Sequence, residues 1–214
     1  MALQDELDRI TEQTRTLVQP ERLAAGERAI AELLASGIEE RLLQPGTPAP
    51  SFTLPDASGK LVRSEDLLAL GPLVISFFRG RWCPYCVTEL EAWRDHYTEL
   101  RQQGALFVAV SPQTQRQSEF TVSQHGLPFP LLRDEGAVLA DAFGAAYPVP
   151  AYMQQHYRSI LVNIPFINGE QSWRLPIPAT FVIDRSGIIR WRQGSADFRV
   201  RPDPVEVMAT LAQS

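Results

Sequence analysis

The chain has little cysteine, almost no lysine and no long apolar run. Its 214 residues include two cysteines, and Lys60 is the only lysine among 20 basic residues. The formal net charge of −5 gives no reason to expect nucleic acid or an anionic membrane as a partner. No stretch is apolar over the roughly 20 residues that a transmembrane helix needs, so no membrane association is predicted.

The first residues also lack the features of an export signal. Residues 1–10 carry charged side chains and no apolar core. We therefore expect a cytoplasmic protein. In that compartment, two cysteines spaced like Cys83 and Cys86 are more typical of a catalytic or metal-binding site than of a structural disulfide.

Residues 1–44 are predicted to form a helical extension. Apolar residues recur at helical spacing from Leu3 to Leu17, Pro20 interrupts the pattern, and a second helix is expected over 21–35. The amphipathic stripe needs a surface to bury against, which is either the rest of the chain or a second copy of it.

Residues 45–214 are predicted to form one α/β domain. Short strands are expected first, over 52–54 and 61–62. Strands and helices then alternate, with strands at 73–78, 106–110 and 129–132 and helices at 84–103, 115–124 and 138–143. This alternation favours a sheet with parallel members and right-handed crossovers.

Residues 145–173 break the alternation and are interpreted as an insertion. A short helix is expected over 151–159. The dipeptide Asn168-Gly169 is a strong hairpin-turn signal, so a hairpin is predicted there.

The end of the chain is predicted to form a hairpin and a helix. Strands over 179–184 and 187–191 flank a short turn and should pair antiparallel. The final helix is expected over 204–212, with Asp203 as its N-cap.

The two cysteines lie in the motif Trp82-Cys83-Pro84-Tyr85-Cys86, between the apolar strand 73–78 and the helix that follows. Two thiols at positions i and i+3 can close a disulfide on themselves. The unpaired N–H groups and positive dipole end of the helix stabilise a thiolate, which is the reactive form of cysteine. The motif therefore predicts a redox site.

Two other interpretations of the cysteines are half of a zinc site and an inert pair of thiols. Zinc needs four ligands, and the sequence has no second pair of cysteines and no paired histidine motif. His96, His125 and His156 are isolated from one another. No metal and no cofactor is predicted.

A second element is Pro178, which directly precedes the strand at 179–184. Proline cannot donate to a sheet ladder, so it is expected at the start or edge of a strand. Most X-Pro bonds in folded proteins are trans.

The segment 78–86, followed later by 177–184, resembles the thioredoxin fold. The segment 50–54 is similar to the segment that leads into the domain in peroxiredoxin-like proteins of the alkyl hydroperoxide reductase/thiol-specific antioxidant (AhpC/TSA) group. The resemblance covers roughly residues 45–210 and leaves the amino-terminal helices out. It implies a central mixed sheet flanked by helices and a cis peptide bond before Pro178, facing the cysteine motif.

The sequence departs from the peroxiredoxin pattern P-x-x-x-T-x-x-C in two ways. That pattern places Arg79 at the proline, Cys83 at the threonine and Cys86 at the attacking cysteine, and the arginine that the family expects falls on Pro178. The threonine and arginine stabilise the charge that develops during peroxide reduction. Their absence puts efficient peroxide reduction in doubt, and the candidates to supply the charge are Arg79, Arg81 and Arg174.

The resemblance leaves two assignments of the cysteines open. In the thioredoxin pattern Cys83 is the attacking thiolate and Cys86 resolves the mixed disulfide. In the peroxiredoxin pattern Cys86 attacks.

Neighbouring residues are predicted to support either cysteine. Trp82 shields the site or meets a partner, and Arg79 and Arg81 favour the thiolate through charge. Simple packing of Trp82 and solvated arginines are the alternatives. Glu89 is interpreted as a carboxylate on the helix surface.

The leading prediction is a thiol-dependent oxidoreductase with an antioxidant role. It would cycle between a Cys83/Cys86 dithiol and a disulfide, reduce peroxides or protein disulfides, and be reset by a thioredoxin- or glutathione-type reductant. The alternative is a redox-sensing interaction protein without significant turnover. The amphipathic extension also makes a homodimer possible.

Overall fold

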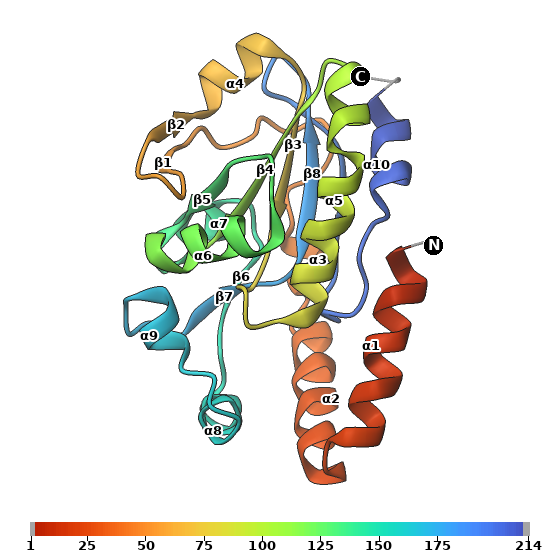
Figure 1. Cartoon of the computed structure of the whole chain (residues 1–214), viewed down its shortest axis with the longest axis vertical. Helices are drawn as coiled ribbons and strands as arrows, with labels where there is room; N and C mark the ends of the chain where they lie inside the picture. Colours follow the sequence, from red (N-terminus) through yellow and green to blue (C-terminus); the bar gives the residue numbers. More distant parts are fainter. Residues whose placement is uncertain (1–2, 212–214) are drawn as a thin grey trace.

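A five-stranded mixed sheet organises the protein (Figure 1). The computed structural model describes residues 3–211. The sheet has the strand order β5 (Leu131–Arg133), β4 (Leu106–Ser111), β3 (Leu73–Phe77), β8 (Ala179–Ile183) and β9 (Ile189–Gly194). Strands β3, β4 and β5 are parallel, whereas β8 runs antiparallel to both β3 and β9. The predicted mixed sheet is confirmed.

The central strands are buried on both faces, which explains their uninterrupted apolar sequence. Every residue of β3 and β4 is buried. Side chains alternate between two core clusters, so that Ile75 and Phe77 face one cluster and Val74 faces the other. The second cluster also contains Cys83 and Cys86, and we call it the cysteine cluster.

Helices cover both faces of the sheet. On the face of the cysteine cluster lie α5 (Pro84–Gln102), α10 (Pro204–Leu211) and α1 (Leu3–Leu17). The opposite face is covered by side chains of α3 (Ile38–Arg41) and α7 (Val138–Ala142), with α2 (Pro20–Ala35) packed against them. The remaining elements are β1 (Thr53–Pro55), β2 (Leu61–Arg63), α4 (Ser64–Leu70), α6 (Gln115–His125), η1 (Glu135–Ala137), β6 (Ala146–Pro148), α8 (Ala151–Ser159), α9 (Ile164–Asn168) and β7 (Arg174–Pro176).

The region 145–173 differs from its prediction at one turn. The expected helix is α8, but Asn168-Gly169 does not form a hairpin turn. Asn168 is the last residue of α9, and Gly169 caps that helix in the left-handed region at φ 73°. A glycine in this conformation ends a helix as readily as it makes a turn, and local sequence does not distinguish the two.

Asp203 caps the last helix as predicted. Its Oδ1 accepts a hydrogen bond from the backbone N–H of Val205 at 2.9 Å. Its Oδ2 accepts a second hydrogen bond, at 3.1 Å, from the N–H of Leu3 at the start of α1. The helix is described to Leu211, and Ala212, at which its end is predicted, lies outside the described residues.

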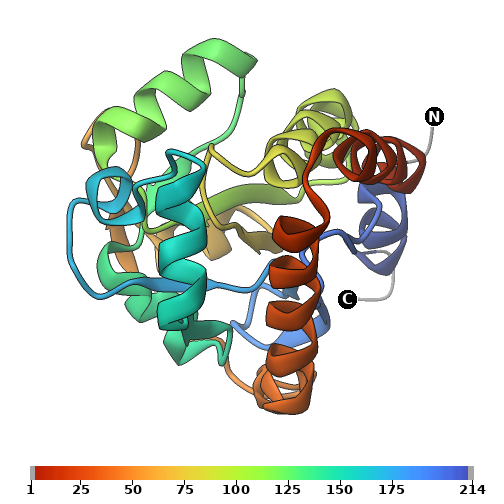
Figure 2. The same cartoon turned by 90° about the horizontal axis from the view of Figure 1, so that it is seen from below.

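The amino-terminal helices diverge from their connection and pack against different parts of the chain, α1 against α5 and α2 against α3 and α8 (Figure 2). Leu3 and Leu7 of α1 are buried in the cysteine cluster. The Thr11 hydroxyl lies 3.2 Å from the Tyr85 hydroxyl, within the cysteine motif. The first half of the stripe therefore packs against its own chain, whereas Leu17 at its end is exposed.

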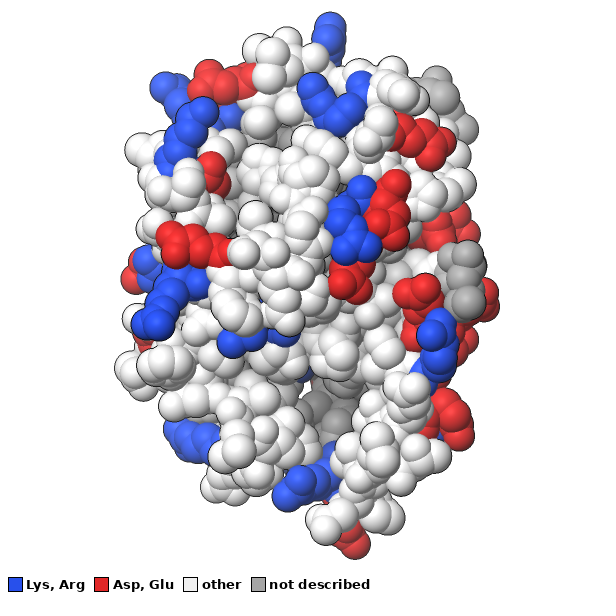
Figure 3. Space-filling view, in the orientation of Figure 1, with Lys and Arg blue, Asp and Glu red and all other residues white. Residues whose placement is uncertain are grey.

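The surface carries no concentrated charge on the face shown in Figure 3, where basic and acidic side chains are interspersed. That face is hollowed in its lower half. Among residues 3–211, no helix has both the length and the apolar composition needed to cross a bilayer.

We predict that Leu7→Ala lowers the free energy of unfolding by about 2–5 kcal/mol, because it leaves a cavity in the cysteine cluster. Urea denaturation measures this change. The matched control is Leu17→Ala in the same helix, since Leu17 is 84% exposed and its loss should cost little. Equal stabilities of the two variants would show that α1 does not pack as described.

Candidate functional site

The cysteines lie where β3 passes into α5. Cys83 is the N-cap residue of α5 with an extended backbone, and Pro84 occupies the first turn, where its missing N–H costs nothing. The Cys86 N–H donates to the Cys83 carbonyl at 3.1 Å. Both thiols are free and almost fully buried, with exposed fractions of 2% for Cys83 and 0% for Cys86.

The loop before the motif needs a glycine at position 80. Gly80 has φ 136°, and a Cβ there would lie 2.7 Å from the indole nitrogen of Trp82. Glycine therefore lets the chain turn closely beneath Trp82 and bring the cysteines to the start of α5.

Arg79 is buried beside Cys83. Its guanidinium donates to the Tyr157 hydroxyl, and its Nη1 lies 3.9 Å from the Cys83 sulfur. The guanidinium carbon lies 4.6 Å from the centre of the Trp82 ring and 4.4 Å from that of Phe198. Within residues 3–211, Arg79 makes no ion pair with a carboxylate, and its Nε has no hydrogen-bond partner.

Arg201 is the residue that sequence reasoning missed. It is 5% exposed and its Nη2 donates to the Cys86 sulfur at 3.3 Å. Its Nη1 pairs with the Glu89 carboxylate, and the Phe198 carbonyl accepts from its Nε at 3.0 Å. No spacing relates Arg201 to the cysteine motif, because the two meet only through the tertiary fold.

The interpretation of Glu89 as a surface carboxylate is wrong. The residue is 2% exposed and faces Arg201, while the Ser76 hydroxyl donates to its other oxygen at 3.2 Å. Ser76 in turn accepts from the Thr180 hydroxyl at 3.2 Å. Glu89 stands three residues after Cys86, which places both on one face of α5, and that spacing was the available signal.

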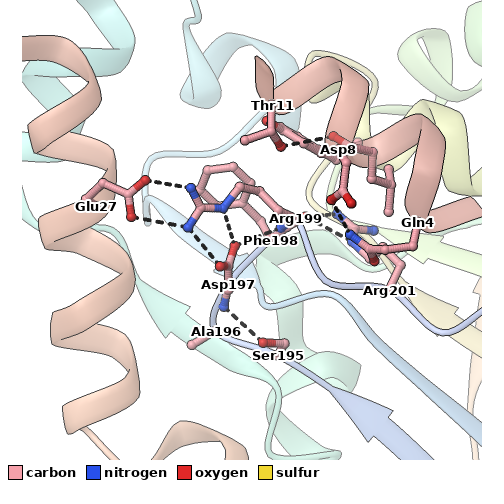
Figure 4. A network of polar contacts seen from close by, with 12 residues as sticks. Gln4, Asp8, Thr11, Glu27, Ser195, Ala196, Asp197, Phe198, Arg199 and Arg201 are labelled. Carbon is pink, nitrogen blue, oxygen red and sulfur yellow. Dashed lines mark hydrogen bonds and ion pairs between the residues drawn. The ribbon is translucent and has the colours of Figure 1, made fainter. Parts of the chain in front are cut away.

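The segment 195–203 carries Arg201 and is fixed by the amino-terminal helices (Figure 4). Arg199 donates to both carboxylate oxygens of Glu27 in α2, at 2.5 and 3.2 Å, and to Asp197 at 2.8 Å. The Ala196 N–H donates to Glu39 at 2.7 Å. These contacts hold the segment in the position from which Arg201 reaches Cys86.

The two thiols have opposite pKa shifts. Burial raises the pKa of the Cys83 thiol, and the adjacent Cys86 sulfur raises it further. Burial also opposes ionisation of Cys86. However, the hydrogen bond with Cys83 and the charges of Arg201 and Arg79 outweigh it and hold the pKa of Cys86 well below its usual value. The arrangement therefore favours a Cys86 thiolate next to a protonated Cys83.

The other residues selected from the sequence divide into two groups. Trp82 lies at the site, with its ring 5.1 Å from that of Tyr157. Arg81 is exposed and turns to α6, where its guanidinium lies 4.5 Å from the Phe120 ring, so the fold does not bring it to the thiols. Arg174 pairs with Asp141 at 2.5 Å instead.

Pro178 is buried between β7 and β8, but the expected cis bond is wrong, since no peptide bond of the described residues is cis. The backbone on both sides of this peptide bond is held by hydrogen bonds. The Ile177 N–H donates to the Ala145 carbonyl at 2.8 Å, and the Pro178 carbonyl accepts from the Ser195 N–H at 3.1 Å.

Solved structures share this architecture. Peroxidoxin BcpB from Mycobacterium tuberculosis matches with a TM-score of 0.63 at 23% identity, over 80% of this chain and 97% of that one. Peroxiredoxin Q from Xanthomonas campestris matches with a TM-score of 0.59 at 20% identity, over 76% of this chain and 90% of that one. The fold is therefore the thioredoxin-like fold that these peroxiredoxin structures have.

The family model described as "AhpC/TSA family" matches residues 45–192. The chain belongs to this family, and the resemblance seen in the sequence is confirmed. The amino-terminal helices and Arg201 lie outside the matched residues.

Curated relatives agree with this assignment. Chloroplastic peroxiredoxin Q of Oryza sativa subsp. japonica is 27% identical over 146 residues, which are 68% of this chain and 57% of that protein. Alkyl hydroperoxide reductase E of Mycobacterium bovis is 29% identical over 75% of this chain and 91% of that protein. The thiol-disulfide oxidoreductase ResA of Halalkalibacterium halodurans is 30% identical over 58% of this chain and 66% of that protein. The chain thus spans less than two thirds of the length of several curated relatives.

We predict that Arg201→Gln raises the pKa of Cys86, because it removes the cation nearest that sulfur. The ultraviolet absorbance of the thiolate, followed as the pH is lowered, measures the shift. Arg192→Gln is the matched control, since the Arg192 guanidinium bonds to Gln44 at 3.3 Å. An unchanged titration in Arg201→Gln would contradict the assignment of Arg201 as the activating cation.

Proposed function

We propose that the protein is a thiol-dependent peroxidase in which Cys86 attacks the peroxide and Cys83 resolves the product. One observation carries this assignment. The Arg201 guanidinium and the Cys83 thiol both face the Cys86 sulfur, and the pKa of Cys86 is lowered while that of Cys83 is raised. The thiolate is the form of cysteine that attacks a peroxide, so Cys86 is the nucleophile and the protonated Cys83 is the resolving thiol.

The reaction follows from these protonation states. The Cys86 thiolate attacks one peroxide oxygen and the O–O bond breaks, so the sulfur becomes a sulfenic acid and an alcohol, or water, leaves with a proton. The Cys83 sulfur then attacks the sulfenic acid, which releases water and forms the disulfide. Two electrons from an external thiol reductant of the thioredoxin or glutathione type restore the dithiol.

The geometry also supplies substitutes for the groups that this chain lacks. The peroxiredoxin pattern places a threonine at position 83 and an arginine at position 178, where this chain has Cys83 and Pro178. We assign the hydrogen-bond donor to the Cys83 thiol and the stabilising cation to Arg201. Arg201 thus becomes the leading candidate for the stabilising cation, in place of Arg79, Arg81 and Arg174. Arg79 contacts Cys83 instead.

Burial favours a small oxidant over a protein disulfide. A disulfide held in another protein must approach a sulfur in line, but Cys83 is 2% exposed and Cys86 is 0% exposed. A peroxide is small enough to enter such a site. Membership of the AhpC/TSA family favours turnover over the redox-sensing alternative. A cytoplasmic location and a homodimer stay predictions.

Single-cysteine variants test the assignment. Cys86→Ser should reduce peroxide consumption by several orders of magnitude, to the rate of an ordinary thiol, because it removes the activated sulfur. Cys83→Ser should still react once per molecule and stop at a sulfenic acid, since nothing resolves it. Stopped-flow kinetics and mass spectrometry of a dimedone adduct measure both results.

A reversed pattern, in which Cys86→Ser forms the stable sulfenic acid, would make Cys83 the nucleophile. Wild-type protein that consumes hydrogen peroxide and alkyl peroxides no faster than a free thiol would remove the peroxidase function.

A further inference from the structure

The buried charges around the thiols balance only while one sulfur is ionised. Arg79 and Arg201 bring two positive charges into the cysteine cluster. The Glu89 carboxylate, which accepts hydrogen bonds from Arg201 and Ser76, balances one of these two positive charges. Arg79 has no carboxylate partner among the described residues, so no carboxylate balances its charge. The second negative charge is that of the Cys86 thiolate, whose pKa the charges of Arg201 and Arg79 both lower.

Oxidation removes one of the two negative charges. A Cys86 thiolate, a Cys83 thiol, one peroxide and one proton give a disulfide, an alcohol and water. The disulfide is neutral, whereas Arg79 keeps its proton. A buried cation without a counter-charge is costly, so the oxidised protein gains from any anion that reaches Arg79.

A cavity of about 230 Å³ adjoins Arg79, between α2, α8 and the end of β6. Its lining is mostly apolar and includes Ala29, Leu33, Met153 and Phe198. Its volume exceeds the roughly 150 Å³ of an apolar cavity known to hold benzene, but it is smaller than the sites of drug-sized ligands.

Charged groups at this cavity favour an anion. Arg79 and Arg41 both line it, and Glu32 is its only acidic lining residue among the described ones. The Glu32 carboxylate is already engaged, by Arg28 at 2.7 Å and by the Tyr152 hydroxyl at 2.6 Å. The unpartnered Nε of Arg79 is a remaining donor inside the protein.

We propose that this cavity binds a small apolar monocarboxylate, and that it does so more tightly when Cys83 and Cys86 form a disulfide. The apolar tail fills the space between α2 and α8, and the carboxylate replaces the thiolate as the counter-charge of Arg79. The inference rests on the redox cycle proposed above, because it requires that the two cysteines form a disulfide.

Isothermal titration calorimetry with octanoate tests the proposal on full-length protein, reduced with dithiothreitol or oxidised with diamide. We expect octanoate to bind the oxidised protein about tenfold or more tightly than the reduced protein, the scale of a charge-assisted hydrogen bond. The uncharged control, 1-octanol, should show no such preference. Equal octanoate affinity in the two states, or no binding, would overturn the proposal.

Thermodynamic linkage provides a second readout. If octanoate binds the disulfide form more tightly, it must make that disulfide harder to reduce by the same factor. Equilibration in dithiothreitol buffers, with and without octanoate, measures the change. A reduction potential that does not respond to octanoate would contradict the calorimetric result.

Three variants locate the site. Arg79→Gln should abolish the preference for the oxidised state, whereas Arg81→Gln, an exposed arginine two positions away, should keep it. Ala29→Phe fills the cavity from α2 without changing a charge, so it should weaken octanoate binding in both states. Unaltered binding in both Ala29→Phe and Arg79→Gln would place octanoate elsewhere and overturn the proposal.

The two proposals fail in different ways. If diamide forms the disulfide and octanoate prefers it, but peroxides do not react, the peroxidase function fails and the binding site stands. If peroxides form the disulfide but octanoate does not distinguish the two states, only the binding site fails. If no oxidant forms the disulfide, both fail.

Discussion

The contact between Arg201 and Cys86 is the interaction on which the site depends. Without a cation, a thiol buried to this extent would stay protonated, because the apolar surroundings disfavour charge. The hydrogen bond with Cys83 and the charges of Arg201 and Arg79 together reverse that preference and lower the pKa of Cys86. Of the two arginines, Arg201 donates to the Cys86 sulfur, and Glu89 holds Arg201 in turn.

The same interaction explains why burial and reactivity coexist here. The cysteine cluster consists of apolar side chains, and yet the buried charged residues Arg79, Arg201 and Glu89 lie beside its thiols. Glu89 accepts from Arg201 and from Ser76, which in turn accepts from Thr180, and Arg79 donates to Tyr157 of the other core cluster. A site built in this way shields a thiolate from large molecules while keeping it ionised.

The sequence predicts the fold well, because its evidence is local. The apolar runs of β3 and β4, the cap at Asp203 and the cysteine motif are each readable within a few residues. The site is predicted only in part. The burial of Glu89 and the role of Arg201 could not be predicted, because both depend on segments that meet only after folding. In the fold itself, the turn signal at Asn168-Gly169 marks the end of a helix instead of a hairpin.

The segment 195–203 links the amino-terminal helices to the cysteine motif, since it contacts α1 and α2 and also carries the arginine that reaches Cys86. Protein synthesis proceeds from the amino terminus, so the cysteine motif leaves the ribosome before this segment does. A partly made chain already contains both cysteines but lacks the cation that ionises one of them. Until segment 195–203 has been made and has folded against them, the thiols should therefore react with oxidants no faster than ordinary thiols.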